Sequence, residues 1–166
     1  MKTETIIKNK MYPVLGAFLL TLALILWEYF NGGVITHHLL ASEDMPGMSN
    51  RWGLLSIPFL TWVSAIIIDK RETKRSKLHP DSKSFTKQIL VRFLAALLFG
   101  LIAGMCWEFG FEGFLQYYML SPILIAVFLP LYLSEYLVGF VIGMLYTFGG
   151  ILPILVGIVL VILCFL

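Results

Sequence analysis

Long apolar runs, separated by two polar segments, dominate the pattern of this chain. The runs do not alternate between apolar and polar residues, as the strands of a membrane barrel would. In lipid a helix satisfies its own backbone hydrogen bonds, and about 20 apolar residues cross a bilayer. The pattern therefore predicts an all-α, polytopic membrane bundle of about five transmembrane helices, near residues 11–30, 52–68, 89–111, 121–142 and 145–166.

The composition agrees with a membrane protein. Hydrophobic residues make up 59% of the chain and charged residues only 13%, against about 25% charged in a typical soluble domain. The lipid bilayer is therefore an expected partner. The last two runs can be divided at either of two breaks, Ser134-Glu135-Tyr136 or Gly149-Gly150. Glu135 accordingly falls either in mid-span or in a turn.

The basic residues are distributed unevenly along the chain. Of the twelve lysines and arginines, three precede the first run, eight lie in or beside the segment 69–88, and only Arg51 lies elsewhere. Since basic residues are enriched on the cytoplasmic side of membrane proteins, we expect the N-terminus and the loop 69–88 in the cytoplasm and the loop 36–51 outside it. Acidic residues such as Asp69 and Glu72 are mixed with the basic ones, which argues against nucleic acid as a partner and favours attraction to anionic lipid.

A Trp-Glu pair occurs twice, at Trp27-Glu28 and 80 residues later at Trp107-Glu108. The segments that begin with the two pairs align without a gap and also share a glycine and a leucine. A carboxylate at membrane depth is costly, so two in register suggest a site produced by duplication. We therefore expect two parallel two-helix repeats, at about 11–68 and 89–142, and an extra helix at about 145–166.

A stripe of five small or polar residues occurs at a spacing of four in and after the third run. Residues at this spacing would share one face of a continuous helix. The half of this stripe nearer the basic loop is small and allows close approach of another helix, so we expect it to help assemble a homo-oligomer. The other half is acidic and amide. The stripe consists of Gly100, Gly104, Glu108, Glu112 and Gln116.

Both Trp-Glu carboxylates are expected near the outer membrane face. Glu108 lies sixteen residues after Arg92, or roughly 24 Å at the rise of an α-helix. Glu28 lies eighteen residues after Lys10, or roughly 27 Å. In a hydrocarbon layer of about 30 Å, these distances place both carboxylates in its outer part.

The polar loop 36–51 carries further chemistry, including two adjacent histidines, His37 and His38. Together with Glu43 or Asp44 and with Glu28 they would bind zinc or iron, and either histidine together with the nearby methionines would bind copper(I). A transition metal ion is therefore the cofactor that this loop would take. The alternatives are an ordered loop with interfacial histidines and a proton relay, because histidine titrates near neutral pH. Tyrosines replace the histidines in the second repeat, which disfavours a symmetric metal centre.

These features lead us to expect a small integral membrane transporter or channel subunit with an acidic site near the outer face. The alternatives are a membrane-embedded, metal-dependent enzyme acting on a lipid or isoprenoid, and a non-catalytic subunit of a membrane complex. The sequence has no nucleophile-elbow, zinc-protease or phosphate-loop motif, so it does not decide whether the chain is an enzyme. The residues expected at the substrate or ion site are Glu28, Glu108, Glu112, His37, His38, Asp44 and Asn50, with His37, His38 and Asp44 as the candidate metal ligands.

Overall fold

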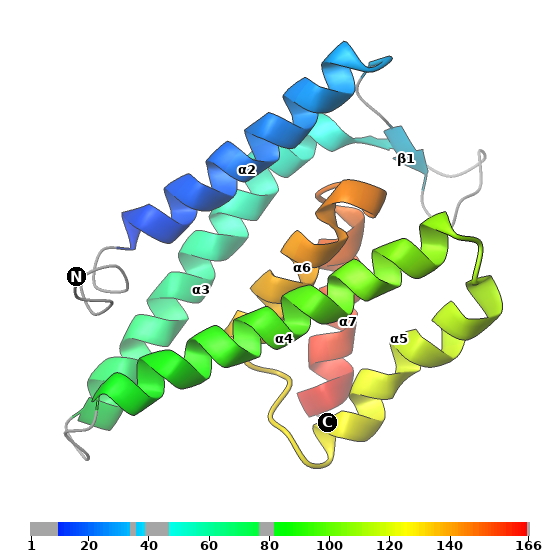
Figure 1. Cartoon of the computed structure of the whole chain (residues 1–166). Helices are drawn as coiled ribbons and strands as arrows, with labels where there is room; N and C mark the ends of the chain where they lie inside the picture. Colours follow the sequence, from blue (N-terminus) through cyan, green and yellow to red (C-terminus); the bar gives the residue numbers. More distant parts are fainter. Residues whose placement is uncertain (1–9, 34–35, 39–46, 77–81, 166) are drawn as a thin grey trace.

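The computed structural model describes residues 10–33, 36–38, 47–76 and 82–165. Within these ranges the chain forms six α-helices, one short 3₁₀-helix and one pair of three-residue strands, so the predicted helical character is confirmed (Figure 1). Many large apolar side chains are exposed on the helices, which is compatible with a membrane protein whose helices face lipid. Among the described residues, three helical segments are long and apolar enough to cross a membrane: Met11–Phe30, Asn50–Arg75 and Phe85–Glu108.

The first two helices form an antiparallel hairpin, which we call the hairpin unit. Its first helix, α2 (Met11–Phe30), has the bounds predicted for the first span. Its second helix, α3 (Gly53–Ser76), continues beyond the predicted end at residue 68 into the basic segment, because lysine, arginine and glutamate are good helix formers. An ion pair of 2.8 Å between Lys10 and Asp69 joins the start of α2 to the last third of α3.

Two names distinguish the ends of the bundle. The basic end is the one where α2 begins and α3 ends, beside the ion pair of Lys10 and Asp69. The Trp-Glu end is the opposite one, where α2 ends at Phe30 and α4 (Ser82–Glu108) ends at Glu108. Each Trp-Glu pair lies in the last turn of its helix.

A break at Gly110 separates α4 from α5 (Glu112–Ala126). The φ angle of Gly110 is +74°, a left-handed conformation that side chains with a Cβ rarely adopt. α4 therefore ends three residues before the predicted boundary at Phe111, and α5 starts in a new direction. The predicted continuous stripe is wrong: its first three residues lie on α4 and its last two on α5.

The C-terminal region contains one helix more than predicted. α6 (Ser134–Phe148) begins at the first of the two candidate breaks and ends at the second, and α7 (Leu152–Phe165) follows. The predicted continuous helix 121–142 is wrong, because the non-helical segment 127–133, which includes Pro130, separates α5 from α6. The two-repeat organisation stays a prediction.

Glycines allow α4 and α6 to form the most extensive helix contact in the described chain, with both helices running in the same direction. A Cβ atom added at Gly100 would lie 2.6 Å from the carbonyl oxygen of Phe140, and one added at Gly143 would lie 3.0 Å from the Cα atom of Gly100. α6 thus covers the small-residue face that we expected between copies of the chain. A homo-oligomer stays a prediction and would need another face.

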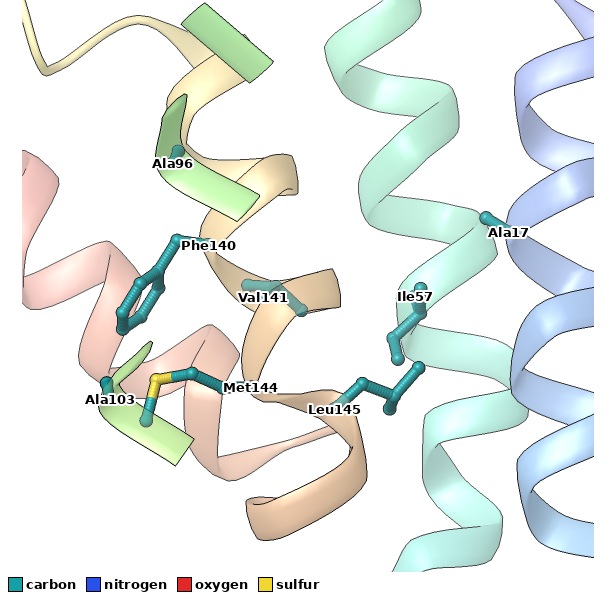
Figure 2. Close-up of a cluster of buried hydrophobic side chains, with 8 residues drawn as sticks. All are labelled: Ala17, Ile57, Ala96, Ala103, Phe140, Val141, Met144 and Leu145. Carbon is teal, nitrogen blue, oxygen red and sulfur yellow. The ribbon is translucent and has the colours of Figure 1, made fainter. Parts of the chain in front are cut away.

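The helices α4, α5, α6 and α7 form a second body, which we call the four-helix unit. It meets the hairpin unit mainly where α3 packs on α6. Figure 2 shows Ile57 of α3 and Leu145 of α6 pointing toward one another, while Phe140 and Met144 lie on the other side of α6. Ile57 and Leu145 are 1% and 2% exposed, so this contact is sealed from solvent and lipid.

A short strand pair connects α2 to α3 at the Trp-Glu end. β1 (Thr36–His38) pairs antiparallel with β2 (Gly47–Ser49), and His37 lies opposite Met48 in the register. A 3₁₀-helix, η2 (Asn50–Trp52), follows directly and leads into α3. The strand pair thereby fixes the position from which Asn50 enters the bundle.

Candidate functional site

Glu135 is a buried carboxylate at the basic end, in the first turn of α6, and is 2% exposed. Its two oxygens accept hydrogen bonds from Nη2 of Arg71 at 2.9 and 2.7 Å, and Oε1 also accepts one from Nη1 of Arg92 at 3.2 Å. Arg71 belongs to α3 and Arg92 to α4, so three helices meet at this carboxylate. Pairing offsets the high cost of burying a charge.

The side chains of the two arginines are more exposed than that of the carboxylate. Their side chains are 26% and 25% exposed, against 1% for the side chain of Glu135. The guanidinium group of Arg71 also lies 6.0 Å from the ring centroid of Phe85, within the range of a cation–π contact. Its Nε atom is buried and has no hydrogen-bond partner among the described residues. Two guanidinium groups against one carboxylate leave one positive charge in excess.

A cavity of about 520 Å³ lies beside Glu135, between the hairpin unit and the four-helix unit. Helices α2, α3, α4 and α6 all contribute to its wall. The volume falls within the range of about 300–1,000 Å³ that is usual for small-molecule pockets. Most of the lining is apolar, and its polar members are Tyr12, Thr61, Ser64 and Glu135.

The aliphatic hydroxyl groups in this cavity, those of Thr61 and Ser64, come from α3. Thr61 donates its hydroxyl proton to the carbonyl oxygen of Ile57 at 2.9 Å, so its oxygen keeps the capacity to accept a further hydrogen bond. Ser64 lies almost one turn further along α3 and is 3% exposed. The cavity therefore offers hydroxyl groups along one helix and a carboxylate at its basic end.

The contact at the Trp-Glu end is centred on Asn50, which is 5% exposed. Its side-chain amide donates a hydrogen bond to the carboxylate of Glu28 on α2. Its Oδ1 atom accepts a hydrogen bond of 3.0 Å from the backbone N–H of Gly150, in the turn between α6 and α7. The backbones of Gly53 and Gly150 also approach closely, because a Cβ atom added at Gly53 would lie 3.2 Å from the Cα atom of Gly150.

No protein-family model, no curated protein and no solved structure matches this chain. The geometry and chemistry of the described residues are therefore the basis for any functional assignment.

The structure brings together two of the residues that the sequence predicted at a site, Glu28 and Asn50. Glu108 is exposed at the end of α4. Glu112 is the first residue of α5, and its side chain lies outside the described part of the structure. A common site for Glu28, Glu108 and Glu112 stays a prediction.

The predicted metal ligands lie at the edge of the described structure. His37 and His38 form part of β1, where only the backbone is described, and Asp44 lies outside the described residues. Among the side chains that the structure does describe, no group of three or more His, Cys, Asp or Glu residues could hold a metal ion. Metal binding by His37, His38 and Asp44 stays a prediction.

The cluster of Glu135, Arg71 and Arg92 was not predicted as a site. The sequence does contain a signal for it, because an acidic residue inside an apolar run requires a cation nearby. Arg92 is the basic residue that extends furthest into the third run, which makes it the expected counter-charge. Arg71 lay in a segment that we expected to be a polar loop, so its contribution could not be foreseen.

Asn50 gives a prediction about stability. Replacing it with alanine removes the group that joins Glu28 to Gly150 and leaves the buried N–H of Gly150 without its acceptor. We expect Asn50→Ala to lower the free energy of unfolding by about 1 to 2 kcal/mol, the usual cost of an unsatisfied buried polar group. Denaturant titration of the purified protein in detergent measures this change.

Asn31 supplies a matched control for this measurement. It directly follows α2, and its exposed side-chain amide donates a hydrogen bond of 2.8 Å to the carbonyl oxygen of Trp27 in the last turn of that helix. We expect Asn31→Ala to change the stability by less than about 0.5 kcal/mol, as is usual for a surface substitution. An equal loss in the two variants would contradict a special role for Asn50.

Proposed function

We propose that this chain is a small membrane transporter whose substrate passes through the cavity between the hairpin unit and the four-helix unit. One observation carries the proposal: the two units touch at both ends of the molecule through polar contacts, yet leave about 520 Å³ between them near Glu135. Transporters commonly work by moving one helical body against another around a central site. Two bodies with a cavity between them fit this mechanism.

The contact at the basic end can open without leaving the buried carboxylate of Glu135 unpaired. Arg71 is on the hairpin unit, whereas Glu135 and Arg92 are both on the four-helix unit. When the units separate, Glu135 therefore keeps Arg92 as its partner, and Arg71, already 26% exposed, moves toward solvent. We call the pair of Arg71 and Glu135 the basic-end latch.

The contact at the Trp-Glu end has the same property. Asn50, in η2 directly before α3, and Glu28 of α2 lie on the side of the hairpin unit, and the hydrogen bond from Gly150 to Asn50 crosses to the four-helix unit. Separation of the units breaks that hydrogen bond and leaves Asn50 with Glu28. We call the contact of Asn50 with Gly150 the Trp-Glu latch. In this proposal Glu28 and Asn50 close the cavity on one side, and the basic end faces the cytoplasm as the distribution of lysine and arginine predicts.

Cysteine labelling tests the proposal without knowledge of the substrate. In a chain whose two native cysteines are replaced with serine, Ser64→Cys places a thiol in the cavity. We expect slow reaction with a membrane-impermeant thiol reagent while both latches are intact. Adding Arg71→Gln is expected to speed labelling by reagent applied at the basic end. Adding Asn50→Ala is expected to speed labelling by reagent applied at the Trp-Glu end. A latch worth about 1.4 kcal/mol gives a change of about tenfold in the open population.

Ala103→Cys is the matched control for this labelling. Ala103 is 0% exposed and lies in α4 away from the cavity, so its thiol should react slowly in every background. Faster labelling at both positions would indicate general unfolding rather than opening of the cavity. If Ser64→Cys stays as slow as Ala103→Cys in both latch variants, the cavity does not open and the transporter proposal is wrong.

A further inference from the structure

The lining of the cavity has one charged side chain among the described residues, the carboxylate of Glu135. Arg71 and Arg92 hold this carboxylate but do not line the cavity themselves. A bound molecule therefore meets apolar walls, the hydroxyl groups of Tyr12, Thr61 and Ser64 and, once Arg71 has moved away, the carboxylate of Glu135. This combination is complementary to a hydrophobic molecule that carries a positive charge.

Aromatic rings and the position of the cavity add to this complementarity. Tyr12 of α2 and Phe93 of α4 both line the cavity, and aromatic faces attract organic cations. α2 and α4 make few direct contacts with each other, although both contribute to the wall. Tyr12 and Leu20, which line the cavity from α2, are 56% and 42% exposed. A hydrophobic molecule can therefore reach the cavity from the surrounding apolar phase between these helices.

The charges at Glu135 make binding and opening mutually dependent. With Arg71 in place, the cluster of Glu135, Arg71 and Arg92 already holds one positive charge in excess. This charge disfavours the binding of a cation in addition to the two arginines. If a monovalent cation takes the place of Arg71, the charge around Glu135 stays the same. The unpartnered Nε atom of Arg71 then also leaves its buried position and can bind water.

We propose that the substrate is a monovalent hydrophobic organic cation, such as a lipophilic amine or a quaternary ammonium or phosphonium compound, which displaces Arg71 from Glu135 in the cavity. This inference rests on the proposed transport function and specifies its substrate class. Because Arg71 belongs to the hairpin unit, displacement by the cation releases the basic-end latch. Substrate binding and opening of the cavity are thus the same event.

Binding of tetraphenylphosphonium to the purified full chain in detergent tests this inference, with equilibrium dialysis as the measurement. Tetraphenylborate is a matched probe, since it has a similar size and shape and the opposite charge. We expect the phosphonium to bind at least about tenfold more tightly than the borate, because the one charged group in the lining is an anion. Equal or tighter binding of the borate would overturn the inference.

Two variants with opposite expected effects make the test specific. Glu135→Gln removes the anion and should weaken phosphonium binding about tenfold or more, whereas Arg71→Gln removes the competing guanidinium and should strengthen it about tenfold. A merely structural ion cluster would not produce tighter binding in Arg71→Gln. Glu72→Gln removes a carboxylate one residue away on α3, outside the cavity lining, and should leave the affinity unchanged.

The outcomes separate this inference from the transport proposal. If Ser64→Cys labelling responds to the latches but the phosphonium does not bind, the substrate class is wrong and transport stands. If labelling does not respond, the proposed function itself fails. If Arg71→Gln and Glu135→Gln both weaken phosphonium binding, Arg71 is not displaced and the inference is overturned.

Discussion

Replacing Glu135 with alanine is expected to lower the free energy of unfolding by about 3 kcal/mol. Removal of one partner from a buried ion pair usually costs about 3–5 kcal/mol, because the remaining charge is buried without compensation. Arg71 and Arg92 are about a quarter exposed and can partly reach solvent, which places the expected cost at the lower end. Titration of the purified protein from mild detergent into a denaturing one measures the loss.

A double variant separates the lost ion pair from other effects of the substitution. When Arg71→Ala is combined with Glu135→Ala, one of the two uncompensated guanidinium groups disappears. We therefore expect the double variant to be less destabilised than the sum of the two single variants, by about 1–2 kcal/mol of coupling. Strict additivity would show that the hydrogen bonds of 2.7 and 2.9 Å contribute no mutual stabilisation.

The local parts of this fold could be predicted because they depend on neighbouring residues. The apolar run that forms α2 is bounded by polar residues on one side and by two glycines on the other, and its limits were predicted correctly. Both candidate breaks in the last part of the chain are real ends of α6. We had treated the two breaks as alternatives, whereas the chain uses both, so its last part has one helix more than predicted. The number of five membrane spans stays a prediction.

The candidate site could not be predicted because its contacts join distant parts of the chain. Arg71 and Arg92 lie 64 and 43 residues before Glu135, and Asn50 lies 100 residues before Gly150. Arg71 reaches its position because α3 continues past its apolar part. The helix propensity of the polar residues favours this continuation but does not determine it. Pairing of Glu28 with Asn50 was within the predicted set, but a set of seven residues did not specify which two would meet.

For the small-residue stripe, the sequence correctly predicted a face for close helix packing but did not predict which helix would pack there. Gly100 and Gly104 do form a face for close helix packing, as their spacing predicts. The helix that occupies this face is α6 of the same chain, since Phe140, Gly143 and Thr147 lie against it. Spacing along one helix describes the shape of its surface but contains no information about which helix will fill it.

The packing of α6 on α4 leads to a second large expected effect, at Gly143. A Cβ atom added there would overlap the carbonyl oxygen of Leu97 and lie 3.0 Å from both the Cα atom of Gly100 and the backbone N of Leu101. All three neighbours are backbone atoms, so no side chain can rotate to make room. We expect Gly143→Val to lower the free energy of unfolding by about 3 kcal/mol, the upper part of the usual cost of overpacking.

Gly113 provides the control, because it is an exposed helical glycine with no atom within 4 Å of an added Cβ. Valine is a slightly better helix former than glycine, so Gly113→Val should be neutral or stabilising by a few tenths of a kcal/mol. The opposite signs at the two glycines would show that the loss at Gly143 comes from the helix contact. If Gly143→Val unfolds at the same denaturant concentration as the native chain, α4 and α6 are not held together by this close approach. The four-helix unit would then not move as a rigid body, and the proposed transport mechanism, in which two rigid bodies move against each other, would be wrong.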